Sequence, residues 1–442
     1  MTSLSAPAAH ADAAPASAAM HEDALYRRVA WRLLPFLMLC YVVAYLDRVN
    51  VGFAKLQMLQ DLHFSEAMYG LGAGLFFIGY FFFEVPSNLL MHRIGAKATL
   101  ARIMILWSII SALMMFVQVP WQFYTLRFLL GAAEAGFYPG MILYLTYWFP
   151  SHRRAKMVAL FMCAIPVSGV IGGPLSGWIM EAMHGISGLR GWQWMFLIEA
   201  IPSFIVGLLV LSYLDNNIRS AKWLSTAEKD LLERNIANEN QGKQDSHTRL
   251  RDLFADRRIV KMALICFCTV MGQYGLTFWL PSLIKQSGVV GTLNVGLLTA
   301  IPFSVAACSM FLVSRSSDRL RERRWHLIVP FCVGATGLVI AGVFSHNVTL
   351  SLIGLCLAAG GSLATSPLFW SLPTAILSSV GAAAGIAMIN SFANLAGFIS
   401  PYMIGLIKDQ TQSASMGLYV LAGVLLLGAV LTYTVPAKLV NK

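Results

Sequence analysis

Long apolar stretches alternate with short polar segments along nearly the whole chain. Twelve of these stretches are long enough to cross a bilayer as helices, because a helix of about 20 residues spans its hydrocarbon core. Six come before a long polar segment and six follow it, which predicts two similar halves. The predicted spans are 31–54, 67–91, 99–117, 122–148, 155–181, 192–214, 259–284, 294–313, 325–344, 349–374, 382–407 and 413–435.

This order of spans predicts an all-α membrane protein with 12 transmembrane helices in two six-helix bundles. We expect the bundles over residues 31–214 and 259–435, with residues 215–258 as a cytoplasmic linker. Residues 1–30 start as an Ala-, Ser- and Pro-rich segment and are expected to form a disordered cytoplasmic tail. Residues 436–442 are expected to form a second cytoplasmic tail.

Local motifs predict further features of the linker and the spans. Ser225 and Glu228 have the spacing of a helix capping box, which predicts a short amphipathic surface helix in the linker. Segments 169–177 and 397–401 combine glycine with proline. Glycines at such spacing let the backbones of two helices approach closely, so we expect helix packing there.

The composition agrees with a membrane protein. Of 442 residues, 57% are hydrophobic and only 12% are charged, whereas soluble chains carry about 25% charged residues. This excludes a soluble enzyme, a nucleic-acid-binding domain and a disordered scaffold. All seven cysteines lie in apolar stretches and are interpreted as small hydrophobic residues, so no metal or cofactor is expected. No nucleotide-binding glycine motif occurs, so any energy coupling should come from an ion gradient.

The net charge of +11 is explained by topology rather than by an acidic partner. With the N-terminus in the cytoplasm, 26 of the 32 Lys and Arg residues fall on the cytoplasmic side, as cytoplasmic loops of membrane proteins require. Four fall outside, namely Lys55, Arg190, Lys285 and Lys408. We therefore expect a multi-pass protein of the bacterial inner membrane with both termini cytoplasmic.

A few ionisable residues lie inside the apolar stretches, where each costs roughly 2.5–3.5 kcal/mol at a helix centre. Asp47 and Arg48 are consecutive on the first span, so their side chains point about 100° apart. Tyr41, Tyr45 and Arg48 share one face, which suits an arginine that faces a water-filled cavity. Arginine can hold a carboxylate with two parallel hydrogen bonds. Asp47 faces elsewhere and could carry a proton; an internal Asp–Arg pair is the alternative.

Arg127 and Glu134 are seven residues apart on the fourth span and share a helix face. Two turns separate them, so they cannot pair directly. Each is then available to substrate or to a charge on the first span, with a structural network between helices as the alternative. Two further acids, Glu84 and Glu199, are expected to be structural. Glu84 should bind loop amides or arginines near the end of the second span.

Neutral polar residues interrupt the other spans and complete a candidate site. Amide and hydroxyl groups inside a span need partners, which a hydroxylated acid or another helix could supply. These residues are Tyr80, Gln273, Tyr274, Trp370, Ser371, Asn390 and Asn394. The phenylalanines at 76–77 and 81–83 are expected to face lipid or to pack in the protein.

Several motifs occur in an order that resembles the major facilitator superfamily. The loops at 88–97 and 314–324 resemble its cytoplasmic signature, although His92 stands where many members have Asp. A narrower resemblance is to its anion:cation symporters, and among them the tartrate, phthalate and hydroxyphenylacetate permeases. It rests on YLDRVNVGFA at 45–54, FEVPSN at 83–88, EAGFYPG at 134–140 and YWFP at 147–150. The resemblance covers residues from about 27 to 435.

The resemblance implies a secondary transporter that imports an organic carboxylate by proton symport. It implies that Asp47 and Glu134 are the proton-coupling acids and that Arg127 is a charge partner or gate. Together with the polar interruptions, it favours a substrate site made of Tyr45, Arg48, Tyr80, Arg127, Gln273, Trp370, Ser371 and Asn394. The carboxylate could be a tartrate-like diacid, an aromatic acid or a sugar acid.

The expected partners are a small organic anion, protons and the lipid bilayer, with no nucleic acid, and the protein is expected to be a monomer. Two other functions stay open. One is a drug/proton antiporter, against which the two arginines argue, and the other is a transporter-like sensor that binds an anion without moving it. No loop carries a cluster of catalytic groups, so an enzyme is not expected.

Overall fold

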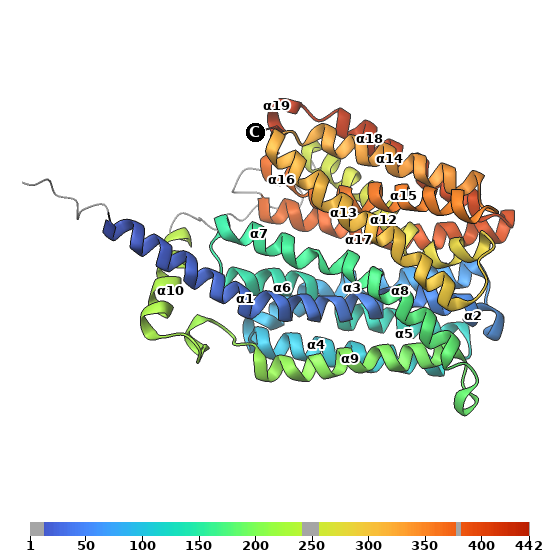
Figure 1. The fold of residues 1–442 in the computed structure, drawn as a ribbon, viewed down its shortest axis with the longest axis horizontal. Helices are drawn as coiled ribbons and strands as arrows, with labels where there is room; N and C mark the ends of the chain where they lie inside the picture. The colour runs from blue at the N-terminus through green and yellow to red at the C-terminus, as the bar shows by residue number, and fades with distance from the viewer. Residues whose placement is uncertain (1–12, 241–255, 377–381, 442) are drawn as a thin grey trace, which may run out of the picture.

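The computed structural model of the protein describes residues 13–240, 256–376 and 382–441. Every regular element in these ranges is a helix, and the long helices run alongside one another (Figure 1). The helices of the first half and the linker are α1 Ala13–Val49, α2 Val51–Leu62, α3 Glu66–Ile94, α4 Ala96–Leu113, η1 Met114–Phe116, α5 Pro120–Glu134, α6 Phe137–Thr146, α7 Ser151–Met162, α8 Ala164–Ala182, η2 Ile186–Gly188, α9 Gly191–Tyr213, η3 Ile218–Ser220 and α10 Thr226–Asn240. Those of the second half are α12 Arg257–Gln286, α13 Thr292–Leu320, α14 Arg324–Val343, α15 Val348–Phe369, α16 Ser371–Ile376, α17 Ala382–Thr411, α18 Ala414–Tyr433 and α19 Ala437–Val440.

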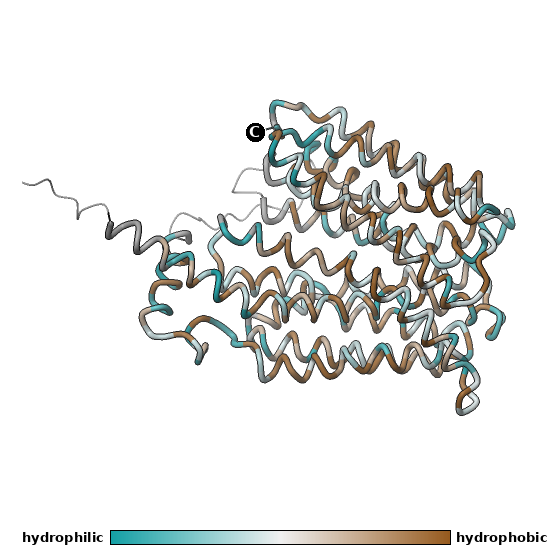
Figure 2. The backbone as a smooth tube through the Cα atoms, in the orientation of Figure 1, coloured by the Kyte–Doolittle hydropathy of each residue, from teal (hydrophilic) through white to brown (hydrophobic). Residues whose placement is uncertain are grey.

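Eleven helical segments in the described ranges are long and apolar enough to cross a membrane. Most match the predicted spans closely, for example Glu66–Met91 against 67–91, but the first extends over Glu22–Leu62. The eleventh predicted span corresponds to the thirty-residue α17. Apolar positions, in brown, follow the helices along their length, and polar positions gather toward the two ends of the bundle (Figure 2).

Four spans are each divided into two consecutive helices, which the apolar pattern does not reveal. The divided spans are α1–α2, α5–α6, α7–α8 and α15–α16. The break after α5 is the sharpest, because Ala135 is extended and Gly136 is left-handed with φ of 85°. A Cβ atom at Gly136 would lie 2.6 Å from Ser87 Oγ on α3. Glycine is therefore required here, and the break places Glu134 at the very end of α5.

The two halves pack against each other through two pairs of long helices. α8 packs on α13, and α3 packs on α17. Glycines allow the first contact: a Cβ atom on Gly173 would lie 2.6 Å from the backbone oxygen of Gly296. Helix packing was expected at the glycine-rich segment 169–177, and the structure shows that this packing joins one half to the other. The fifth and eighth spans meet in one pair, and the second and eleventh meet in the other.

A disordered tail was expected over residues 1–30, and this expectation is wrong for residues 13–30, which are helical. α1 begins at Ala13 and continues without interruption into the first span; residues 1–12 lie outside the described residues. Alanine is the strongest helix former, which favours helix in this segment. Contacts then hold its end in place: Asp23 lies 2.5 Å from Arg153 of α7, and Arg28 forms an ion pair with Glu228 of α10.

The predicted surface helix in the linker is confirmed as α10. Ser225 N donates to Glu228 Oε2 at 2.9 Å, and Glu228 N donates back to Ser225 Oγ at 3.4 Å. This is the reciprocal capping box that the spacing predicts. The backbone hydrogen bond from Ser225 is the main cause that lowers the pKa of Glu228, and the Arg28 guanidinium lowers it further. Part of the linker, residues 241–255, lies outside the described residues.

Candidate substrate cavity

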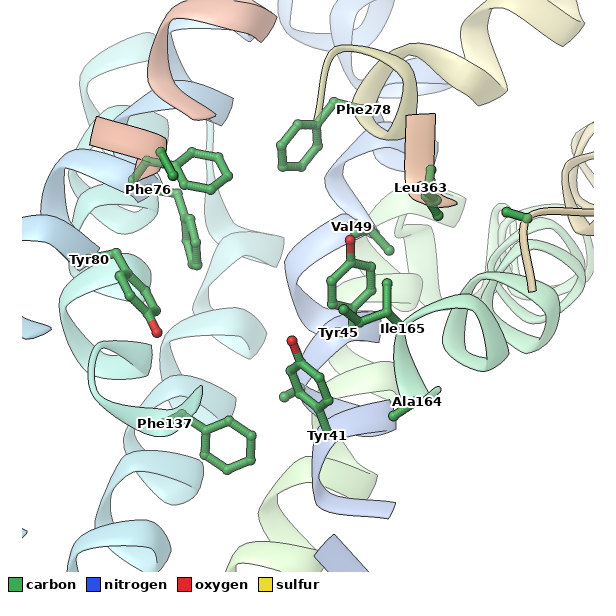
Figure 3. Packing of buried hydrophobic residues seen from close by; sticks show 14 of the residues in the cluster. Tyr41, Tyr45, Val49, Phe76, Tyr80, Phe137, Ala164, Ile165, Phe278 and Leu363 are labelled. Atoms are coloured by element: carbon green, nitrogen blue, oxygen red, sulfur yellow. The ribbon is translucent and has the colours of Figure 1, made fainter. Parts of the chain in front are cut away.

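A cavity of about 110 Å³ lies between the two halves. Its lining comes from both halves, with α1, α3, α6 and α7–α8 on one side and α12, α15 and α17 on the other. The lining residues are Tyr41, Arg48, Phe76, Phe77, Tyr80, Tyr138, Met162, Ile165, Cys266, Thr269, Val270, Gln273, Tyr274, Ser366, Phe369, Trp370, Asn390, Ala393 and Asn394. Figure 3 shows Tyr41 and Tyr45 of α1 and Phe76 and Tyr80 of α3 near one another.

Arg48 is the charged residue of this lining and links the two halves. Its Nε donates to Glu134 Oε1 at 3.0 Å, and its Nη2 also donates to that oxygen. Its Nη1 donates to the hydroxyl of Tyr274 on α12 at 3.1 Å. Arg48 is only 6% exposed and Glu134 only 2% exposed. Both charges are therefore buried, and each is neutralised by the other.

Aromatic rings surround the Arg48 guanidinium. Its Cζ lies 5.2 Å from the ring centre of Phe76, 5.6 Å from that of Tyr45 and 5.7 Å from that of Tyr80. Rings at this distance attract a cation through their negative faces. Tyr45 contacts the Arg48 guanidinium in this way, but it is not part of the cavity lining.

Asp47 lies on the other side of α1, as the sequence predicted. Its carboxylate accepts hydrogen bonds from Trp107 Nε1 at 3.1 Å, Ser111 Oγ at 3.0 Å and Ser203 Oγ at 2.5 Å. These donors come from α4 and α9, and Asp47 is 1% exposed. The predicted proton-coupling acid is thus buried among three neutral donors, outside the cavity lining.

Arg127 faces the backbone of α3 rather than the cavity. Its Nε donates to Gly72 O and its Nη2 to Ala73 O, both at 3.4 Å, and the side chain is fully buried. Nη1 has no hydrogen-bond partner among the described residues. Glu134 lies two turns further along and pairs with Arg48 on the first span. The spacing had left two partners open for Glu134, the substrate or a charge on the first span.

The expectation that Glu84 binds loop amides or arginines is wrong. Its Oε1 accepts from Asn390 Nδ2 at 3.0 Å, and its Oε2 accepts from Asn394 Nδ2 at 3.2 Å. Both asparagines are on α17 and line the cavity, so Glu84 joins the two halves at the edge of the site. The sequence could not reveal this, because more than 300 residues separate the partners. Glu199 accepts from Ser176 Oγ at 2.6 Å within the first half, and it stays a structural residue.

The remaining predicted site residues divide into two groups. Tyr80, Gln273, Trp370 and Asn394 line the cavity together with Arg48. Ser371 is not in the lining; it follows Trp370 at the start of α16, and its hydroxyl donates to Leu368 O at 2.6 Å.

The lining also contains residues that the predicted site did not include. Tyr41 shares the Arg48 face of the first span, and Tyr274 and Asn390 are polar interruptions, so a signal existed for these three. Phe76 and Phe77 are buried at the cavity, whereas Phe81, Phe82 and Phe83 are exposed on the outside of the bundle. For Thr269 and Ser366 the sequence held no signal beyond a hydroxyl in an apolar span.

At the end of the bundle where α2 stops and α3 begins, an ion pair and hydrogen bonds join the two halves. Glu66 at the start of α3 lies 2.6 Å from Lys55 Nζ of α2 and 2.5 Å from Lys408 Nζ of α17. Asp409 of α17 accepts from the backbone N of Glu66 at 3.1 Å, and Lys285 of α12 donates to Leu56 O at 3.0 Å. Two of the four basic residues predicted to lie outside the cell, Lys285 and Lys408, therefore join the halves at this end, and Lys55 pairs with Glu66 within the first half.

A polar cavity between two bundles of apolar helices, which an ion pair and hydrogen bonds join at one end, defines the chain as a membrane transporter. The Major Facilitator Superfamily matches residues 37–401, and the chain belongs to this family. The fold agrees: a bacterial homologue of the human lysosomal transporter Spinster, solved in an inward-facing and occupied conformation, superposes with a TM-score of 0.74 at 16% identity, covering 92% of this chain and 96% of that one. The predicted fold class, twelve transmembrane helices in two bundles, is confirmed.

Relatives from bacteria are similar over nearly the whole chain. A protein from Pseudomonas putida named for metabolite transport, NicT, is 49% identical over 95% of this chain and 96% of its own. A protein from Agrobacterium vitis named for tartrate transport is 50% identical over 93% and 94%. A quinolone resistance transporter from Acinetobacter baumannii is 41% identical over 95% and 96%.

Proposed function

We propose that the protein imports an organic carboxylate by proton symport and alternating access. The observation that carries this proposal is the position of Arg48. It lies in the wall of the cavity, and one guanidinium contacts an acid of its own half and a tyrosine of the other half. Arginine presents a planar set of donors that matches a carboxylate. A substrate carboxylate in the cavity would therefore bind at Arg48.

The ion pair between Arg48 and Glu134 supports the coupling to protons. Nε and Nη2 of Arg48 both donate to Glu134, so these donors are not available to substrate while Glu134 is charged. A proton on Glu134 removes that charge and releases the guanidinium. In this proposal the proton and the anion bind together. Protonation of Glu134 frees Arg48 to bind the anion, and an anion bound at Arg48 favours the protonated form of Glu134.

Asp47 and Arg127 support the same scheme from outside the cavity. Asp47 is proposed as the second proton-coupling acid, since it is buried and is directly followed by Arg48 on α1. Arg127 binds the backbone of α3 and lies two turns before Glu134 on α5. Its proposed role is to position α5, and with it Glu134, rather than to touch the substrate.

The rest of the lining supports a hydroxylated or aromatic acid. Tyr80, Gln273 and Asn394 offer hydroxyl and amide groups, and hydroxyl groups of a tartrate-like diacid or a sugar acid would satisfy them. Phe76 and Phe77 would contact the ring of an aromatic acid. The relative named for tartrate transport favours the diacid.

The location proposed for the protein is the bacterial inner membrane, where it would act as a monomer with both termini in the cytoplasm. The first turns of α1 lie at the same end of the bundle as α19 and α10 (Figure 1). Arg219 of η3 and Lys229 and Arg234 of α10 lie at this end too, which supports a cytoplasmic assignment. The end closed by Glu66, Lys55 and Lys408 then faces outward, and the proposed state is one closed to the outside.

The second candidate function is export of a drug in exchange for protons, which the similarity to a quinolone resistance transporter favours. The test is uptake of labelled tartrate, an aromatic acid and a sugar acid into proteoliposomes with an imposed pH gradient, acidic outside. Symport predicts that one of these acids accumulates against its gradient. Quinolone movement opposite to protons, without uptake of any acid, would favour the antiporter. A protein that binds an acid but shows no counterflow would be a sensor.

A further inference from the structure

A second, larger groove lies outside the substrate cavity, between α1 and α7. Its volume is about 1010 Å³. One continuous face of α1 forms one wall, because the lining positions on this helix recur every three or four residues. The face of α7 that carries Arg153, Met157 and Leu160 contributes to the opposite wall. The groove and the cavity at Arg48 share no lining residue.

Both walls change in the same direction from charged to apolar. On α1 the lining proceeds from Arg27 to Trp31, Leu34 and Met38. On α7 it proceeds from Lys156 to Leu160, a turn further along. The first and the fifth spans run in the same direction across the bilayer, so the basic residues of both helices lie at one membrane surface. The apolar residues of both helices lie deeper.

Two of the cations at the rim, Arg27 and Lys156, differ from Arg153 in their surroundings. Arg153 is neutralised by Asp23 at 2.5 Å and by Glu22 at 3.6 Å, and its guanidinium lies 4.4 Å from the ring centre of Tyr26. Arg27 and Lys156 are exposed and form no ion pair within the described part of the chain. Below them Trp31 is 75% exposed and Leu160 is 42% exposed.

We propose that this groove binds one anionic phospholipid, with its phosphate at Arg27 and Lys156 and an acyl chain along the apolar residues of α1 and α7. Basic pockets between helices at a membrane surface bind anionic headgroups. Apolar side chains at acyl-chain depth accept a hydrocarbon chain without cost, since lipid tails are as apolar as leucine. The ligand contacts both α1 and α7, so it holds the N-terminal part of α1 against the fifth span.

Native mass spectrometry of the full-length protein in detergent tests this, with phosphatidylglycerol and phosphatidylcholine of identical acyl chains as the probes. The expected result is retention of phosphatidylglycerol about tenfold stronger than of phosphatidylcholine, since each basic residue near an anionic headgroup adds to binding. The double variant Arg27→Gln/Lys156→Gln should lose this preference. The control, Arg257→Gln/Lys261→Gln at the start of α12, also removes two basic residues at the start of a span and should keep it.

A second variant separates the acyl-chain contact from the headgroup contact. Leu160→Trp narrows the groove at acyl-chain depth and leaves both cations in place, so it should weaken retention of phosphatidylglycerol. Inorganic phosphate in excess should not displace the lipid. Equal retention of both lipids by the unmodified protein, an unchanged preference in the double variant, or displacement by inorganic phosphate would each overturn the proposal. None of these results depends on which substrate the protein carries.

Discussion

Glu134, at the last position of α5, accepts two hydrogen bonds from the guanidinium of Arg48 on α1. The pair is almost fully buried, and the break in the fourth span directly after Glu134 brings the carboxylate to this position. Because Arg48 also lines the cavity, a change at Glu134 alters the group that would bind an anionic substrate. This relationship is the basis of the proposed coupling.

Replacing Arg48 should remove anion binding. Loss of one partner from a buried charge pair costs roughly 2–5 kcal/mol, which weakens affinity by about 30-fold or more. We expect this loss for Arg48→Ala, and a smaller one for Arg48→Lys, which keeps the charge without the planar set of donors. Isothermal titration of the transported acid measures the effect. Unchanged affinity in Arg48→Ala would remove Arg48 from the substrate site.

Replacing Asp47 should separate binding from coupling. Asp47→Asn keeps the size of the side chain, and it lies outside the cavity lining, so the affinity for the acid should change by less than about threefold. Accumulation driven by a pH gradient should be lost, while counterflow continues. Ser176→Ala, which removes the hydroxyl bound to Glu199 instead, is the matched control and should keep accumulation. Gradient-driven accumulation by Asp47→Asn would exclude Asp47 from proton coupling.

The contact between Glu84 and Asn394 should stabilise the association of the two halves. Glu84→Ala leaves two half-buried amide donors of α17 without this acceptor, so we expect a loss of stability of about 1 kcal/mol, the size of an ordinary hydrogen bond. A double-mutant cycle with Asn394→Ala, followed by thermal unfolding in detergent, measures the part that belongs to the pair. Additive effects of the two single variants would show that the two side chains do not interact.

The ion pairs of Glu66 should hold the proposed outer end closed. Glu66→Gln removes the charge that joins Lys55 of the first half to Lys408 of the second, so the population open at this end should rise. Spin labels at Met68 and Gln412, both exposed, report the distance between the halves in a background without native cysteines. Arg190→Gln, which lies 3.8 Å from Asp61 within the first half, should leave the distance unchanged. A distance distribution in Glu66→Gln equal to that of the unmodified protein would contradict this prediction.

The apolar pattern predicts where the spans are, because a bilayer requires about 20 apolar residues of every helix that crosses it. The facing of Asp47 and Arg48 also follows from helix geometry alone. The helix break at Gly136 could not be predicted, since glycine is common in membrane helices and only its contact with Ser87 makes it necessary here. Tertiary contacts decide such cases.

Pairs between distant segments are the other part that sequence does not reveal. The contacts of Glu84 with α17 and of Glu66 with Lys408 depend on how the two halves dock, and nothing local to either residue indicates the partner. Arg127 illustrates the same limit: its charge marks it as unusual, but its position against the carbonyl groups of α3 decides that it does not reach the cavity.

Uptake by Glu134→Gln in proteoliposomes, measured with the labelled acid and an imposed pH gradient, tests the central claim most directly. Glutamine keeps the shape of the side chain and cannot exchange a proton, and it leaves Arg48 without its countercharge. We predict that this variant binds the acid and exchanges it in counterflow but does not accumulate it when the gradient is applied. Accumulation equal to that of the unmodified protein would contradict proton coupling through the pair of Glu134 and Arg48.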